Sequence, residues 1–188
     1  MTPRTQLLEA AAAEFAFRGF DGATFAGIAS RLGKGRSYVQ HYARTKEELA
    51  RQVMTEGDFV AVLAGMTGGI RQLRRACEVA ADRYAGDASA RAALRLHAER
   101  PDLNPENNPL ATWTSSLEQL LSEALEDGNL ASGTDVAALA QHLVAGILGY
   151  GALCEASGAL HEMPSKVHSF VNDLLRTDPA CGVRRDAR

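Results

Sequence analysis

The sequence predicts an all-α protein, with an N-terminal three-helix head that contains a helix-turn-helix, followed by a larger helical body. Good helix formers such as Ala, Leu, Glu and Arg are abundant, and β-branched residues are scattered rather than grouped in runs. Apolar residues also recur at helical spacing along most of the chain. The 188 residues, 46% of them hydrophobic, are enough for a small head and a larger body with a core.

The first helix is expected from Pro3 to about Arg18. Gly19 is well placed to end it as the glycine after the C-cap, and Phe20 is expected to pack back onto the helix. The inner stripe of this helix is formed by Leu7, Leu8, Ala11, Ala12 and Phe15.

Two short helices separated by a glycine are predicted next, which is the pattern of a helix-turn-helix. Thr24 is a suitable N-cap for the first of them, and Gly33 ends it. The apolar face of this helix is formed by Phe25, Ile28, Ala29 and Leu32. The second helix is too polar to be buried, since it carries Arg36, Ser37, Tyr38, Gln40, His41 and Tyr42.

Five cations surround this second helix with no acidic residue between them: Arg31, Lys34, Arg36, Arg44 and Lys46. A short polar helix framed by cations suits the major groove of DNA. The formal net charge of the chain is −3, but residues 1–50 hold seven Lys/Arg against five Asp/Glu. The positive charge is therefore expected where the helix-turn-helix lies.

A fourth helix is expected to start after Thr45 as N-cap and to run to about Gly65, linking head and body. The body then follows as helices over 70–86, 88–99, 109–126, 135–157 and 164–175. Residues 100–108, with two prolines, are predicted as a loop. The expected division is a DNA-binding head at 1–50, a helical body at 51–178 and a loose tail at 179–188.

Several classes of protein are disfavoured. The three cysteines show no C-x-x-C pair, which argues against a disulfide framework or a zinc site and fits a cytoplasmic protein. No signal peptide or apolar run of about 18 residues is visible, so no membrane partner is expected. His142, His161 and His168 lack metal-ligand spacing. No nucleophile elbow, phosphate-binding glycine loop or paired His/carboxylate motif supports an enzyme.

The head resembles the TetR family of transcriptional repressors. The resemblance is carried by Glu14-Phe15-x-x-x-Gly19-Phe20-x-x-Ala23-Thr24-Phe25-x-x-Ile28-Ala29, then Gly33, then Lys46-Glu47-Glu48-Leu49. The body is similar, more weakly, to the γ-butyrolactone receptor branch of actinobacteria, through Leu94-Arg95-Leu96 with Glu99, then Trp113, Leu120-Leu121-x-x-Ala124 and Gly128, and the closing Val171-x-x-Leu174-Leu175.

The resemblance implies a homodimer that binds a palindromic DNA operator and is released by a small signalling molecule, with no other cofactor. It also implies that the body at 51–178 is the ligand-binding and dimerisation domain. The effector would be a neutral lactone or furan-like compound, and the regulated genes would serve antibiotic or other secondary metabolism. The alternative is a regulator of the same type that has lost butyrolactone recognition or senses antibiotics or late metabolites. A helical scaffold for protein partners would leave the cation pattern between Arg36 and Lys46 unexplained.

Family members often read Gly-Val-(Ser/Thr)-Lys-Gly-x-Leu-Tyr-x-His-Phe across the turn and recognition helix. A gapless alignment places Gln40, Tyr42 and Ala43 on the usual Tyr, His and Phe. A shift by one residue would place His41 and Tyr42 on the His-Phe pair but needs an insertion before Lys46. We prefer the gapless register.

Two kinds of DNA contact are expected. Hydrogen-bond donors suited to phosphate oxygens are carried by Thr24, Ser37, Tyr38, Tyr42 and Lys46. Base edges could be reached by Lys34, Arg36 and Gln40. The full predicted DNA-binding set is Thr24, Lys34, Gly35, Arg36, Ser37, Tyr38, Gln40, His41, Tyr42 and Lys46. A solvated polar helix is the alternative. The predicted effector-binding set is Trp113, Tyr84, Gln141, Leu117, Val144 and His97, each of which could instead be an ordinary core or surface residue.

Three glycines, Gly146, Gly149 and Gly151, fall inside the longest predicted helix, where each costs about 1 kcal/mol relative to alanine. Close helix approach at a dimer interface, room for a ligand, or simple looseness could account for them.

Overall fold

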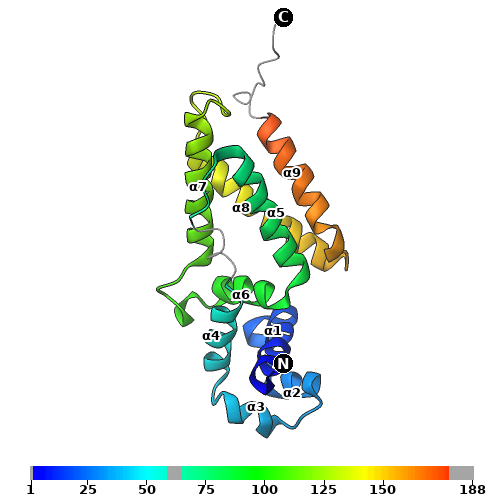
Figure 1. The fold of residues 1–188 in the computed structure, drawn as a ribbon. Helices are drawn as coiled ribbons and strands as arrows, with labels where there is room; N and C mark the ends of the chain where they lie inside the picture. The colour runs from blue at the N-terminus through cyan, green and yellow to red at the C-terminus, as the bar shows by residue number, and fades with distance from the viewer. Residues whose placement is uncertain (1, 59–64, 178–188) are drawn as a thin grey trace, which may run out of the picture. The chain divides into compact units, whose positions relative to one another are not determined.

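The computed structural model describes residues 2–58 and 65–177, and every regular element in them is helical, which confirms the all-α prediction. Figure 1 shows their course. The elements are α1 (Pro3–Gly22), α2 (Phe25–Leu32), α3 (Arg36–Tyr42), α4 (Lys46–Glu56), α5 (Gly69–Gly86), α6 (Ala88–Glu99), η2 (Pro101–Leu103), α7 (Pro109–Glu126), α8 (Val136–Ala156), η3 (Leu160–Glu162) and α9 (Met163–Thr177).

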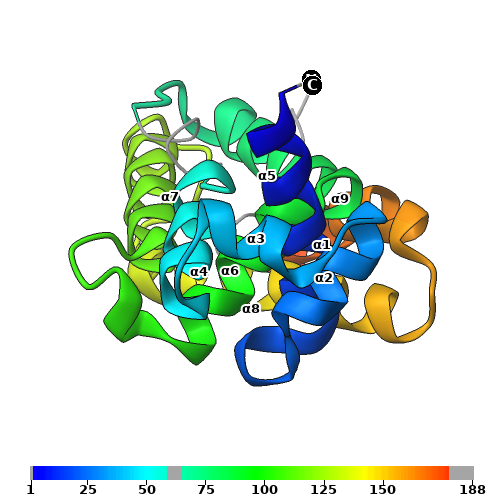
Figure 2. The ribbon, with the colours of Figure 1, turned by 90° about the horizontal axis from the view of Figure 1, so that it is seen from below.

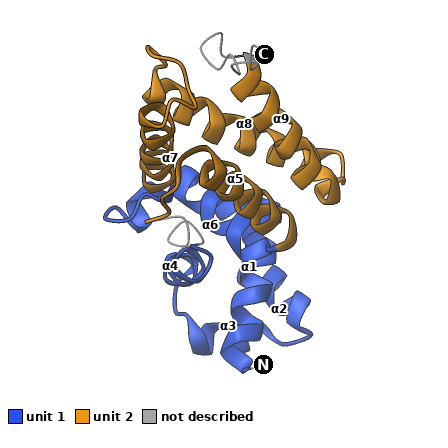
Figure 3. Cartoon of the chain, turned by 45° about the horizontal axis from the view of Figure 1, so that its top comes forward, with its two compact units in different colours: residues 1–59, 87–109 blue, residues 60–86, 110–188 orange. Residues whose placement is uncertain are grey.

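The chain divides into two compact units, shown in Figure 3. Unit 1 consists of residues 1–59 and 87–109, and unit 2 of residues 60–86 and 110–188. This division differs from the boundary expected after residue 50, because α6 and η2 belong with the head. Ala92, Leu96 and Leu103 lie in the same buried cluster as the apolar residues of α1 and α4. The expected tail at 179–188 lies outside the described residues.

The break in α1 falls at Gly19, as predicted. Gly19 has a φ of 69°, in the left-handed region that favours glycine, and Phe20 turns back so that its ring stacks on Phe15 with centroids 6.3 Å apart. A Cβ on Gly19 would lie 2.6 Å from a carboxylate oxygen of Glu99 and 2.8 Å from the guanidinium of Arg95. The glycine therefore also permits α6 to approach the end of α1.

Both predicted threonine caps are present. Thr24 accepts from the backbone N–H of Gly27 at 3.0 Å, and Thr45 accepts from that of Glu48 at 3.1 Å. The prediction that the fourth helix reaches Gly65 is wrong, because α4 ends at Glu56 and Gly57 is its C-cap. The apolar residues that suggested the longer helix, Phe59, Val62 and Leu63, lie outside the described residues.

In unit 2, α5 packs against α8 and α9, and α8 packs against α9. Two of the α8 glycines are explained by aromatic rings within this unit. A Cβ on Gly146 would overlap the ring of Phe170, and a Cβ on Gly151 would lie 2.7 Å from the ring of Tyr84. Gly149 has no neighbour at its Cβ position among the described residues.

One described helix, α8, is long and apolar enough to cross a membrane by length and composition, with a mean hydropathy of 1.5 in its most apolar window. Only 33% of that window is buried within the chain. Its contacts with α5 and α9 identify α8 as a packed helix of unit 2. Its exposed residues include the polar Gln141, His142 and Glu155 beside small and apolar ones.

Changing Glu99 to glutamine tests the link between α1 and α6. The Glu99 carboxylate accepts from the Phe20 N–H at 2.6 Å and from Arg95 at 2.7 Å. Partial burial opposes its charge, but these two donors outweigh that effect and lower the pKa of Glu99. We expect Glu99→Gln to lower the free energy of unfolding by about 1 kcal/mol at pH 7, a modest value because the carboxylate is partly exposed.

The sign of the pH dependence follows from the lowered pKa. The contribution of Glu99 is fully present above the pKa of an unfolded glutamate, about 4.3, and is lost as pH falls through the lower folded value. The free energies of unfolding of wild type and variant, measured in urea, should therefore differ at pH 7 and differ less in acid. Glu9→Gln, an exposed change on α1, is the control. A pH-independent difference would contradict this account.

Candidate nucleic-acid interface

The turn between α2 and α3 is built by backbone hydrogen bonds. Gly33 takes the left-handed conformation with a φ of 63°, and its N–H donates to the Ser30 carbonyl at 3.1 Å. The N–H of Lys34 donates to the Ala29 carbonyl at 3.0 Å. Figure 2 shows α2 and α3 as neighbouring helices, and α2 packs against both α1 and α3. The chain thus forms the helix-turn-helix that its sequence predicts.

Two buried residues fix how α3 is oriented. Val39 is fully buried and Ala43 is 1% exposed, so this side of α3 faces the core of unit 1. In the gapless family register these are the Leu and Phe positions, whereas the shifted register would put the half-buried Tyr42 on the Phe position. The burial pattern therefore favours the gapless register.

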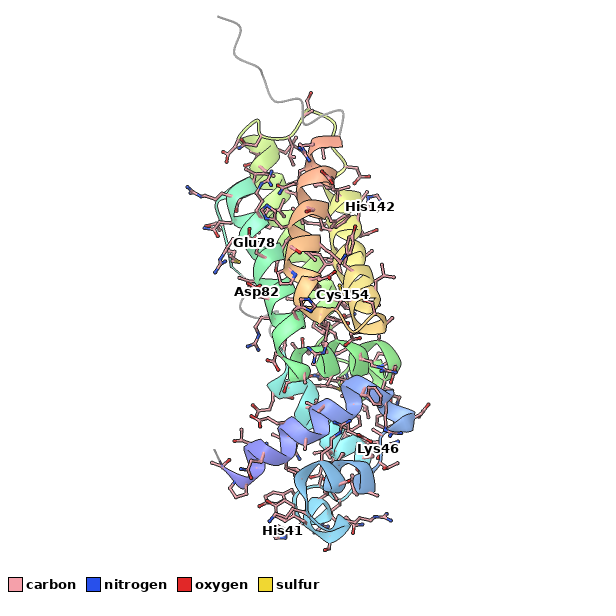
Figure 4. All side chains as sticks on the ribbon, turned by 90° about the vertical axis from the view of Figure 1, so that its right-hand side faces the viewer. His41, Lys46, Glu78, Asp82, His142 and Cys154 are labelled. Atoms are coloured by element: carbon pink, nitrogen blue, oxygen red, sulfur yellow. The ribbon has the colours of Figure 1, made fainter. Side chains whose placement is uncertain are left out.

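The opposite side of α3 carries the predicted DNA-contacting side chains. Residues one turn apart share a helix face, and the exposed pairs here are Arg36 with Gln40 and Ser37 with His41. Lys34 and Gly35 are exposed in the preceding turn. Figure 4 shows His41 at the outer end of unit 1. The structure therefore brings this part of the predicted set onto one accessible surface.

A row of rings runs along the edge of that surface. The Tyr38 and Tyr42 centroids are 5.3 Å apart, His41 and Tyr42 are 5.1 Å apart, and the Lys34 ammonium lies 5.9 Å from the Tyr38 ring. A hydrogen bond with Tyr38 raises the pKa of Tyr42, so the Tyr42 hydroxyl keeps its proton at neutral pH. It can then donate to a phosphate oxygen.

Lys46 lies apart from α3. Its ammonium donates to the carbonyls of Phe20, Asp21 and Ala23 at 2.7, 3.3 and 3.3 Å, and it lies 4.5 Å from the Phe20 ring. Figure 4 shows that Lys46 does not lie beside His41. Its role within the chain is to hold the end of α1 to the start of α4. Thr24 remains exposed, and its hydroxyl can still donate while it caps α2.

Sequence reasoning missed the role of Arg31 and Glu14. Glu14 is only 3% exposed, and it pairs with Arg31 at 2.8 Å and with Arg18 at 3.1 Å. Arg31 therefore joins α2 to α1 and its charge is compensated. The available signal was an acidic residue within the apolar stripe of α1, where a buried charge needs a partner.

The predicted effector-binding residues do not form one group. Trp113, Leu117, Val144 and Tyr84 are buried in unit 2, with exposed fractions of 1%, 0%, 7% and 9%. The other two residues differ from these four. Gln141 is exposed on α8 and not buried as predicted. The sequence of α8 is apolar on nearly all sides and does not reveal which face is internal. His97 is buried, but α6 places it in unit 1.

No group of residues suited to hold a metal ion occurs among the described residues. Cys77 and Cys154 are free thiols and buried. Burial raises the pKa of Cys77 to about 12, which keeps it protonated and unreactive at neutral pH.

The comparisons with known proteins agree with this geometry. Residues 7–53 match the model of the bacterial regulatory proteins of the TetR family. No curated protein matches the chain. Among solved structures, one concerned with control of antibiotic production by bacterial hormones is 28% identical, with a TM-score of 0.70, and the match covers 94% of this chain and 98% of that one.

TylP, a TetR regulator from Streptomyces fradiae, is 25% identical with a TM-score of 0.61, over 94% of this chain and 86% of that one. CprB, a TetR family protein from S. coelicolor A3(2), is 22% identical with a TM-score of 0.78, over 97% and 92%. The chain therefore carries the DNA-binding domain of the TetR family of bacterial regulatory proteins, within the helical fold that solved members of that family share.

Proposed function

We propose that this protein is a cytoplasmic, ligand-responsive transcriptional repressor that binds a palindromic operator as a homodimer. The observation that carries the proposal is the exposed face of α3, where Arg36, Ser37, Gln40 and His41 lie opposite the buried Val39 and Ala43. A helix held to its domain by one side and polar on the other fits the major groove. In a dimer, the two α3 helices would meet half-sites about 34–36 Å apart.

The homodimer is supported by the outer surface of α8. Ala145, Gly149 and Ala152 are exposed and follow one another at helical spacing, and Leu153 beside them is 67% exposed. An apolar helix surface of small residues permits close approach of another helix, and a second copy of the same surface is its simplest cover.

The effector is proposed to be a neutral γ-butyrolactone or furan-like molecule, with secondary-metabolite or antibiotic genes as targets. Support comes from the structural neighbours, which include proteins described as γ-butyrolactone receptors. Trp113, Leu117, Val144 and Tyr84 supply the apolar surroundings that a small neutral ligand requires. The alternative is a TetR-type regulator that senses antibiotics or late metabolites, or that has lost its response to a ligand. Measuring which compounds release the protein from its operator distinguishes this alternative from a butyrolactone receptor.

Arg36→Ala tests the DNA-reading face. We expect operator affinity to fall about 5- to 160-fold and sequence preference to relax, because an arginine contact with a base contributes about 1–3 kcal/mol. Binding to the chain's own upstream DNA is measured by gel shift at fixed salt. Arg75→Ala, which removes an exposed cation from α5 in unit 2, should leave binding unchanged. Equal affinities for wild type and the Arg36 variant would refute the assignment.

Ala152→Glu tests the dimer. A carboxylate on the exposed side of α8 would be desolvated at an interface without a partner, so we expect the sedimentation coefficient to fall to that of a monomer at micromolar concentration. Ala98→Glu makes the same change on the exposed side of α6 and should leave the dimer intact. If both variants sediment like wild type, α8 is not the interface.

Trp113→Phe tests the effector region while keeping an aromatic ring in the core. We expect unchanged operator binding but a weaker response to an organic extract of the culture in which the native gene is expressed. The extract concentration for half-release is measured by gel shift, and Leu175→Met is the core control in the same unit. Normal release from the Trp113 variant would leave this residue with a packing role alone.

A further inference from the structure

The exposed side of α3 carries two long polar side chains that no other part of unit 1 engages. Arg36 and Gln40 are both exposed, and within residues 2–58 and 65–177 neither side chain makes a hydrogen bond or an ion pair. The buried Val39 and Ala43 hold the other side of α3 against the core, so the helix cannot turn this pair inward. Arg36 and Gln40 are therefore available to an external partner.

The neighbouring side chains are engaged with one another along one edge of this surface. The Tyr38 and Tyr42 ring centroids are 5.3 Å apart, and the His41 ring meets Tyr42 edge-on at 5.1 Å. The Lys34 ammonium lies 5.9 Å from the Tyr38 ring. The hydroxyl and ammonium groups on this edge suit phosphate oxygens, which fix the position of a protein on DNA without reading its sequence. Contacts with base edges are left to the exposed pair.

The spacing of the pair matches the spacing of base pairs. Residues four apart in an α-helix share a face and are separated by about 6 Å along the axis, at about 1.5 Å per residue. Base pairs in DNA are stacked about 3.4 Å apart. A helix that lies along the major groove therefore brings Arg36 and Gln40 to positions about two base pairs apart.

The two side chains differ in the base that each can recognise. A guanidinium donates two parallel hydrogen bonds, and guanine presents two acceptors, O6 and N7, in the major groove. A glutamine amide has one donor group and one acceptor, and adenine presents the matching acceptor N7 and donor N6. Ser37, which is also exposed on α3, carries a hydroxyl that suits either kind of base edge and so discriminates little.

We propose that Gln40 is a specificity-determining residue that reads an adenine in each half-site of the operator, about two base pairs from a guanine read by Arg36. This inference rests on the proposed function, because it names the DNA sequence that the same helix would select. In a homodimer the two copies of α3 enter successive major grooves, so the guanine–adenine pattern occurs once in each half of the palindrome.

The test is the selection of bound sequences from a library of random double-stranded DNA at fixed salt. The full-length wild type is compared with Gln40→Glu and Gln40→Ala. We expect wild type to select both bases and Gln40→Glu to select cytosine in place of the adenine, because a carboxylate accepts from the N4 amine of cytosine. Gln40→Ala should accept any base at that position, and the guanine should persist with all three proteins.

Gel shifts with operators that differ only at this position measure the size of the effect. For each half-site changed, wild type should bind the adenine form about 5- to 160-fold more tightly than the cytosine form, the range for one bidentate contact, and Gln40→Glu should reverse that order. Gln6→Glu makes the same change on the exposed side of α1 and is the matched control. It should leave the selected bases unchanged.

Three results would overturn the proposal: a wild-type motif in which no adenine lies within three base pairs of a guanine, the same selected bases for Gln40→Glu as for wild type, or an adenine preference that survives in Gln40→Ala. The manner of failure separates this proposal from the repressor itself. A palindromic motif that the Gln40 changes do not alter refutes the adenine contact alone. A wild type that selects no sequence refutes the repressor, and the adenine contact with it.

Discussion

The junction at Gly19 and Phe20 is the constraint on which unit 1 depends. A left-handed glycine lets the Phe20 N–H reach the Glu99 carboxylate, while Arg95 donates to the carbonyls of Ala16 and Phe17. The Phe20 ring is also approached by two cations, Lys46 at 4.5 Å and Arg100 at 4.3 Å. Because α2 packs on α1 and α3 on α2, the position of α3, the helix proposed to contact DNA, follows from how α1 is held.

The packing of unit 1 also determines which cations near α3 are paired within the chain and which are exposed. Five surround α3 in the sequence, but Arg31 is paired with the buried Glu14, and Lys46 donates to three carbonyls. Lys34, Arg36 and Arg44 are exposed. Two of the five cations near α3 therefore hold the helices of unit 1 together, and the three exposed ones are left for the proposed contacts with phosphates or bases.

A small molecule can control DNA binding only if it binds the DNA-bound and released states with different affinity. In unit 2, Trp113, Leu117, Val144 and Tyr84 are buried and give a neutral ligand the apolar surroundings it needs. In unit 1, α6 packs against both α1 and α4, so a displacement of α6 would also disturb α1, on which α2 packs.

The sequence by itself determined the helical class, the caps at Thr24 and Thr45, the break at Gly19 and the helix-turn-helix, because these features depend on local spacing and backbone preference. Only the tertiary structure decided that residues 87–109 belong with the head, that α4 ends at Glu56, that Gln141 faces outward and that Arg31 is paired. Each of these depends on contacts between residues far apart in the chain, and helical periodicity within one segment does not specify them.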